Sequence, residues 1–168
     1  SYEARAFGVG SGMPLRLAAR KCPDAVILPV AGPAYDAASI VVMDTLRAQQ
    51  WAGVPVDVQV LGWDEAFVAA RPGQPLGEGG GSPRDALTFA EQLRAEVLAA
   101  TELHCSVGIG SNKLQAKIAT DFGKPRGTYT ITDETWFDEM GDRPTRALWG
   151  IGAQTAKKLA ALGIDTVR

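Results

Sequence analysis

Residues 56–68 read Val-Asp-Val-Gln-Val-Leu-Gly-Trp-Asp-Glu-Ala-Phe-Val, and the other segments of the chain can be placed around this stretch. Valine alternates with polar residues over its first five positions, which is the pattern of a half-buried strand, and an apolar run follows the two acids. The stretch therefore predicts two antiparallel strands joined by a tight turn that carries Asp64 and Glu65.

Asp64 and Glu65 at the lip of a sheet would offer carboxylate oxygens, the ligands that hard cations such as Mg²⁺ require. Adjacent acids are also common at the solvated tip of a hairpin, where they bind nothing. These two acids alone do not decide between a metal site and a solvated hairpin tip, so the choice depends on the neighbouring segments.

The composition narrows the class of protein. The chain has 168 residues, 46% of them hydrophobic, so it can bury a core of its own. A net charge of -2 gives no overall signature of a nucleic-acid-binding protein, so any polyanion site must be local. Cys22 and Cys105 fit no metal or redox spacing and predict reduced thiols. The absence of a leader and of a bilayer-length apolar run predicts a soluble, cytoplasmic protein with no membrane partner.

The first residues predict a short helix and then a glycine-rich loop around Gly12 and Met13, where the backbone can approach a ligand closely. Tyr2 and Arg5 lie three positions apart and would share a helix face, whose hydroxyl and guanidinium suit phosphate oxygens. An exposed helix end is the alternative. Residues 26–30 predict a short buried strand.

The middle of the chain alternates helix, loop and strand. A helix is expected over residues 34–50, a glycine- and proline-rich loop over 71–83, a second helix over 84–100 and a strand over 105–109. The buried positions of the second helix are predicted to be Leu87, Ala90, Leu93 and Val97. The strand is expected to pair with the acidic hairpin.

A basic helix is predicted after that strand, with Asn112 as a candidate cap and Gly123 at its end. Between positions 112 and 127 there are four basic residues and one acid. Pairing of the strand with the hairpin would bring Lys113 and Lys117 near the carboxylates, and carboxylates for metals with lysines for phosphates form a nucleotide-handling set. A lysine cluster is also typical of a solvated helix face.

Residues 147–167 predict two helices joined by Gly150, Ile151 and Gly152. Glycine amides at a helix N-terminus can face a phosphate, and Lys157 lies nearby in the second helix. A helical hairpin that packs only on its neighbour is the alternative.

Together these motifs resemble the Y-family DNA polymerases, in the bacterial translesion branch called DNA polymerase IV. Residues 2–14 are similar to the family's fingers motif, 63–67 to its palm motif, 106–127 to its conserved strand and helix, and 149–159 to its thumb hairpin. The resemblance runs along nearly the whole chain.

The resemblance implies an α/β (α+β) fold in three parts. These are partial fingers over residues 1–30, a ferredoxin-like palm sheet with two helices on one face over 31–132, and a partial helix-hairpin-helix thumb over 133–168.

Roles for individual residues follow from the same resemblance. The implied catalytic residues, which also bind two Mg²⁺ ions, are Asp64 and Glu65. The implied nucleotide-binding residues are Tyr2, Arg5, Gly12, Met13 and Lys124. The implied DNA-binding residues are Lys113, Lys117, Gly150, Ile151, Gly152 and Lys157.

The implied reaction adds deoxynucleotides to a primer 3′ end by two-metal phosphoryl transfer, with low fidelity and on damaged templates. Its partners would be primer-template DNA, deoxynucleoside triphosphates and, through C-terminal regions, a sliding clamp.

The sequence also departs from the family pattern. The family's first strand, with a further metal-binding aspartate, would lie upstream of Ser1, and its C-terminal DNA-gripping domain would lie beyond Arg168. The chain is therefore expected to be a fragment without polymerase activity of its own. Gly62 and Trp63 replace the usual serine and aliphatic residue, and Ala6 and Gly10 occupy positions that are often basic in the family.

Three other functions remain open from the sequence. The chain could be a polymerase-like protein that binds DNA or a partner without catalysis, or a stand-alone helix-hairpin-helix module. It could also be a nucleotide cyclase, whose palm-like sheet likewise offers carboxylates to metals.

Overall fold

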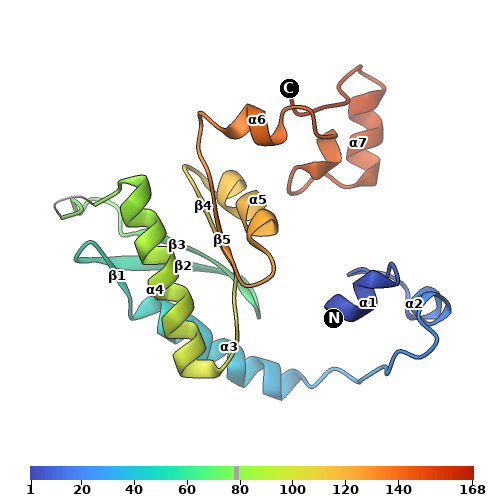
Figure 1. The fold of residues 1–168 in the computed structure, drawn as a ribbon, viewed down its shortest axis with the longest axis horizontal. Helices are drawn as coiled ribbons and strands as arrows, with labels where there is room; N and C mark the ends of the chain where they lie inside the picture. Colours follow the sequence, from blue (N-terminus) through green and yellow to red (C-terminus); the bar gives the residue numbers. More distant parts are fainter. Residues whose placement is uncertain (78–79) are drawn as a thin grey trace. The chain divides into compact units, whose positions relative to one another are not determined.

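The computed structural model describes residues 1–77 and 80–168 (Figure 1). It divides into two compact units, Ser1–Pro33 and Ala34–Arg168. The first unit contains two short helices, α1 (Tyr2–Ala6) and α2 (Leu15–Lys21). The side chain of Ser1 caps α1 by accepting a hydrogen bond from the Ala4 amide, which satisfies one of the amides that a helix start leaves without a partner.

The predicted strand over residues 26–30 is wrong. This segment carries no regular structure, and its apolar side chains face solvent, with Val26 84% exposed. A strand needs a neighbour that shares its backbone hydrogen bonds, and none of the described residues pairs with this segment. Apolar character alone was therefore insufficient to make it a strand.

Helix α3 (Gly32–Arg47) begins at the end of the first unit and continues into the second. An antiparallel sheet follows, made of β1 (Gln50–Trp51), β2 (Val54–Gly62) and β3 (Glu65–Ala70) in the order β1-β2-β3. The predicted acidic hairpin is confirmed, because Val58 of β2 pairs with Val68 of β3 and Gly62 pairs with Glu65. Only two residues lie between the strands.

Helix α4 (Pro83–Thr101) follows, and the Ser82 side chain caps it by accepting from the Asp85 amide. Its buried residues are Phe89, Ala90, Leu93 and Val97, so the prediction was right for three positions and wrong for Leu87, which is exposed. Phe89 stacks on Trp51 at 5.4 Å between ring centroids, so the buried face of α4 includes position 89 and not position 87. Within the predicted loop over 71–83, residues 71–77 and 80–82 carry neither helix nor strand, and positions 78 and 79 lie outside the described residues.

The first core lies between the three-stranded sheet and two helices. Phe89 and Leu93 of α4 bury Val56 of β2, and Leu46 of α3 packs against the same cluster. In Figure 1, α4 crosses β2 and β3. Two helices thus contribute to one core against the sheet, and each fully buried large apolar side chain stabilises it by about 1.5–3 kcal/mol.

The second half of this unit contains β4 (Val107–Gly110), α5 (Lys113–Gly123) and β5 (Thr128–Ile131). The two strands form a separate parallel pair, so the expectation that the strand over 105–109 pairs with the acidic hairpin is wrong. Helix α5 carries the chain back so that β5 arrives beside β4 and takes up its backbone hydrogen bonds. The predicted Asn112 cap and the end of the helix at Gly123 are confirmed.

The second core joins α5 and β5 to the C-terminal segments. Ile118, Ala119, Ile131 and Met140 form its buried centre. The last helices are α6 (Trp136–Met140) and α7 (Ala153–Ala160), with one 3-10 turn, η1 (Thr145–Ala147), between them. The first helix of the predicted hairpin around Gly150 is therefore only that single turn.

The structure confirms a mixed α+β fold, with separate antiparallel and parallel sheets. Among the described residues, no helix combines the length and the apolar character that crossing a bilayer demands.

Two glycines of β4 allow α5 to lie directly on the strand. A Cβ atom at Gly108 would collide with the Ala116 carbonyl oxygen and the Thr120 amide, and one at Gly110 would lie 2.5 Å from the Gln115 Cβ. We expect Gly108→Ala to lower the free energy of unfolding by about 3 kcal/mol, because backbone atoms cannot move aside as a flexible side chain can.

Urea unfolding followed by circular dichroism measures this change. Gly32→Ala is the matched control, because a Cβ at Gly32 meets no atom within 4 Å, and it should change the free energy by less than about 1 kcal/mol. Equal stabilities of the two variants would contradict the proposed close packing.

Candidate active site

The candidate site is built on the turn between β2 and β3. Trp63 and Asp64 are its two loop residues, and neither has a positive φ. The turn between β1 and β2 differs, because Ala52 and Gly53 have φ of 48° and 80°, which suits the right-handed twist of the flanking strands. The hairpin accommodates its turn through a register shift between Val60 and Gly62.

The residues on either side of Asp64 are both tied to helices. The Trp63 indole N–H donates to Asp36 Oδ1 of α3 at 2.7 Å, and Lys117 Nζ of α5 donates to Glu65 Oε1 at 2.6 Å. Asp64 itself is exposed and makes no hydrogen bond or ion pair with any residue that the structure describes. Its carboxylate is thus free for a ligand, whereas one oxygen of Glu65 is held by Lys117.

Lys113 and Lys117 both approach the hairpin. Lys117 reaches Glu65, and Lys113 Nζ lies 5.8 Å from the centre of the Phe67 ring of β3. The predicted meeting of lysines and carboxylates is confirmed for Lys117 and Glu65, although the route was wrong. The helix supplies this contact, whereas strand pairing had been expected to do so.

The Phe67 ring beside Lys113 is part of an aromatic pair. Phe67 meets Trp149 edge-on at 5.9 Å, and Trp149 is 49% exposed. This places the segment before Gly150 next to β3. Gly150 has φ of 90°, Ile151 is half-buried and Gly152 is the cap of α7, whose first amides have no helical partners. Lys157 is exposed in the last turn of α7.

The remaining predicted residues belong to other elements. Lys124 follows the end of α5, roughly 10 Å along the helix axis from Lys117, and pairs with Asp121 at 2.7 Å. In the first unit, the guanidinium carbon of Arg5 lies 5.4 Å from the centre of the Tyr2 ring, so the predicted shared face is confirmed. Gly12 has φ of 74° in the loop after α1, and Met13 is half-buried.

The donor set fits a magnesium site in part. Asp64 and Glu65 provide two carboxylates, which are ligands of the right chemical kind. Among the described residues, no three or more acidic, histidine or cysteine side chains lie close enough together to hold a metal ion. The turn therefore supplies only part of the ligands that a magnesium ion needs. A cation bound to Glu65 would contact the same carboxylate as Lys117.

The partners of Trp63 could not be read from the sequence. Asp36 lies 27 positions away on another element, and no spacing pattern links two such residues. The available signal was a tryptophan at a tight turn, because an indole that packs against other elements usually finds an acceptor for its N–H group.

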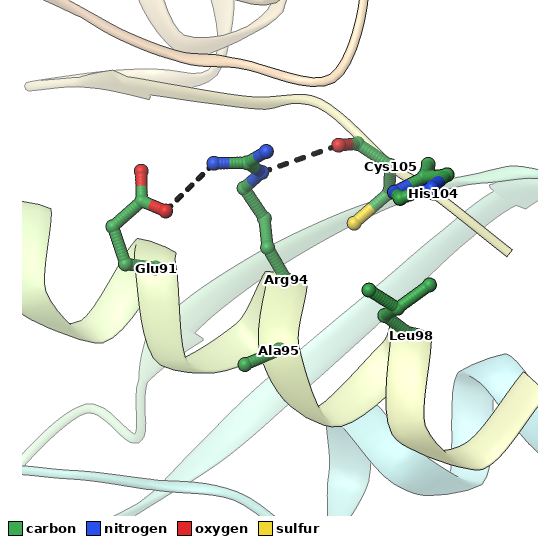
Figure 2. Close-up of a pocket in the computed structure, with 6 residues that line it drawn as sticks. All are labelled: Glu91, Arg94, Ala95, Leu98, His104 and Cys105. Atoms are coloured by element: carbon green, nitrogen blue, oxygen red, sulfur yellow. Dashed lines mark hydrogen bonds and ion pairs between the residues drawn. The ribbon is translucent and has the colours of Figure 1, made fainter. Parts of the chain in front are cut away.

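A separate shallow pocket of about 190 Å³ lies between α4 and the chain that leads into β4 (Figure 2). Arg94 is central to it. Its guanidinium donates to Glu91 Oε2 at 2.6 Å, to the Cys105 carbonyl oxygen at 3.3 Å and to the Arg126 carbonyl oxygen. Because the polar groups satisfy one another, the pocket is a structural junction between α4 and the parallel strands.

Comparisons with known proteins show the family to which the chain belongs. The impB/mucB/samB family matches residues 1–121. The chain is 51% identical to DNA polymerase IV 2 of Mycobacterium tuberculosis over 167 residues, and 36% identical to DNA polymerase IV 2 of Methanosarcina mazei. The alignments cover 99% of this chain but 44% and 42% of these relatives, so the chain spans less than half their length.

Solved structures give the same picture. DinB from Sulfolobus solfataricus superposes with a TM-score of 0.79 at 30% identity, covering 100% of this chain and 46% of that one. An insertion ternary complex of Dbh DNA polymerase gives 0.78 at 30% identity, with 99% and 45% covered. The resemblance to Y-family polymerases stated from the sequence motifs is thereby confirmed.

One testable property concerns Cys105 in the pocket of Figure 2. Burial raises the pKa of its thiol above the ordinary value, because the charged thiolate is poorly solvated there. Less thiolate is then present at any given pH, so we expect Cys105 to react with iodoacetamide at pH 8 more slowly than an unstructured cysteine.

A Cys22→Ser variant isolates the Cys105 thiol for mass-spectrometric rate measurement. Unfolding in urea should restore the ordinary rate, since it removes the burial. A folded-state rate equal to the unfolded one would contradict this description of the pocket.

Proposed function

Because the chain belongs to the impB/mucB/samB family, we propose that it is part of a DNA-directed DNA polymerase of the translesion type, which adds deoxynucleotides to a primer 3′ end with low fidelity on damaged templates. The observation that carries the proposal is the β2–β3 turn. It presents Asp64 to solvent while Lys117 holds the neighbouring Glu65.

Asp64 and Glu65 would hold the magnesium ions. Bound magnesium would stabilise charge on the attacking and leaving oxygens of the phosphoryl group. The side chains at the turn would bind the ions and hold them in position. Asp64 faces solvent on a turn fixed at both sides, and Lys117 keeps a positive charge beside Glu65.

The predicted nucleotide-binding residues would hold the triphosphate and the base. The Tyr2 hydroxyl and the Arg5 guanidinium share one face of α1 and suit triphosphate oxygens, and Lys124 adds a further cation. Gly12 and Met13 would form the loop over the nascent base pair. A phosphate group that displaced Asp121 from Lys124 would exchange one ion pair for another.

Primer-template DNA would contact Lys113, Lys117, Lys157 and the Gly150–Gly152 segment. The amides at the start of α7 can face a backbone phosphate, and the lysines neutralise phosphate charge without reading sequence. The similar Dbh DNA polymerase was solved as an insertion ternary complex, which supports DNA and nucleotide as the class of partners.

We further propose the three-part division into fingers (1–30), palm (31–132) and thumb (133–168). In the described residues β3 and β4 each leave one edge unpaired, and a strand from elsewhere in the parent polymerase would give them a partner. The parent would act in the cytoplasm, and a sliding clamp would engage regions outside these 168 residues.

A second candidate is a polymerase-like protein that binds DNA or a partner without catalysis. It is supported by the ion pair of Lys117 with Glu65, which engages one of the two carboxylates at the turn. The two candidates differ in whether Asp64 is needed for nucleotide addition.

Substitution of Asp64 in the parent polymerase decides between them. We expect Asp64→Ala and Asp64→Asn each to reduce primer extension by at least about 10³-fold, because both remove charge that stabilises the phosphoryl oxygens. DNA affinity should stay within about twofold of wild type. Retained extension by Asp64→Asn would end the catalytic assignment of this residue.

The 168-residue chain should bind DNA weakly and with strong salt dependence, and it should not extend a primer. Its net charge is -2, and few lysines face the proposed DNA path. Neutralising about three phosphates predicts a slope near -3 for the logarithm of the binding constant against the logarithm of salt concentration.

Fluorescence anisotropy across a salt series measures this slope. Lys113→Ala should reduce its magnitude by about one, whereas Arg47→Ala, which removes an exposed cation paired with Asp44, should not. Tight binding that persists at high salt, or robust extension by this chain, would show that the main contacts have been misplaced.

A further inference from the structure

The turn that carries Asp64 is held by a contact that joins it to α3. The Trp63 indole donates to Asp36 Oδ1 at 2.7 Å, and its ring packs on Tyr35 at 5.5 Å between centroids with the planes tilted by 56°. Tyr35 and Asp36 lie near the start of α3, which begins at Gly32. One side chain of a two-residue loop thus makes both a polar and an aromatic contact to a helix.

The backbone of this turn gives a reason why such a contact is needed. A two-residue loop without positive φ matches the twist of its strands poorly, and the pairing shifts next to the loop between Val60 and Gly62. The distal half of β2 is also exposed, so core packing does not hold the tip. A hairpin end of this kind opens readily unless side chains fix it.

The contacts lie symmetrically about Asp64. Trp63 precedes it and is bound to α3, and Glu65 follows it and is bound to Lys117 of α5. Two helices therefore restrain the backbone on both sides of a residue whose own carboxylate is free of protein partners in the described structure. This arrangement orients a ligand group without occupying it.

We propose that Trp63 and Asp36 are positioning residues that fix the Asp64 turn in the geometry needed for cation binding. The inference rests on the proposed function, in which Asp64 is a metal ligand, and adds two residues that act through it. Neither touches the metal. Their indole–carboxylate bond lowers the population of turn conformations in which the Asp64 carboxylate points elsewhere.

Two substitutions break the bond while sparing its surroundings. Trp63→Phe keeps an aromatic ring against Tyr35 and removes the N–H donor, and Asp36→Ala removes the acceptor. Asp36→Asn keeps an acceptor oxygen and serves as the conservative rescue. Asp44→Ala is the control, because Asp44 is an exposed aspartate of α3 that pairs with Arg47.

Amide hydrogen exchange and a Mn²⁺ titration followed by NMR line broadening, both on the 168-residue chain, give the readouts. We expect exchange at residues 61–66 to become about threefold to tenfold faster in Trp63→Phe and Asp36→Ala, with other amides unchanged. The Mn²⁺ concentration that broadens the Asp64 amide should rise by a similar factor. The Trp63 indole resonance should move in Asp36→Ala and return in Asp36→Asn.

The double variant Trp63→Phe with Asp36→Ala should behave like either single variant, because both remove the same bond. Additive effects, or wild-type exchange at residues 61–66 in both single variants, would overturn the inference. Faster exchange throughout the chain would also overturn it, since that marks general destabilisation.

Failure of the proposed function is separately visible. If Mn²⁺ leaves the wild-type Asp64 amide unbroadened, Asp64 is not a cation ligand in this chain and the positioning role for metal fails with it. If Mn²⁺ broadens that amide equally in all variants, the metal assignment stands and the positioning role is wrong.

Discussion

The contact between the backbones of β4 and α5 determines where Lys113 and Lys117 lie. Gly108 and Gly110 have no side chains, so α5 rests on the strand at a distance that no other residue permits. This position sends Lys117 to Glu65 and Lys113 to the Phe67 ring. A larger residue in β4 would lift the helix and carry both lysines away from the acidic turn.

The acidic turn combines restraint with exposure. Trp63 and Glu65 are held by separate helices, while the carboxylate between them faces solvent. The Lys117–Glu65 pair is partly exposed, so it contributes at most about 1 kcal/mol to stability. The pair also places a positive charge beside the two neighbouring carboxylates, which reduces the repulsion between them.

Two charged residues of α4, Glu91 and Arg94, connect this helix to the parallel strands. Arg94 and Glu91 bridge α4 to both parallel strands, since Arg94 donates to the Cys105 and Arg126 carbonyl oxygens and Thr128 donates to Glu91. Arg94 of α4 and the lysines of α5 are all basic residues on helices, so the sequence alone did not separate a cation that joins elements of the fold from cations proposed to bind a ligand. Both kinds occur as isolated charges between apolar residues.

Local sequence was enough to predict the hairpin, the Asn112 cap, the end of α5 at Gly123 and the shared face of Tyr2 and Arg5, because each depends on residues at most a few positions apart. Tertiary structure alone decided three other features. Residues 26–30 remain without strand partners, β4 pairs with β5 and not with the hairpin, and Asp36 meets Trp63. Strand pairing and side-chain contacts between distant elements depend on how those elements pack, and periodicity within one segment carries no information about its neighbours.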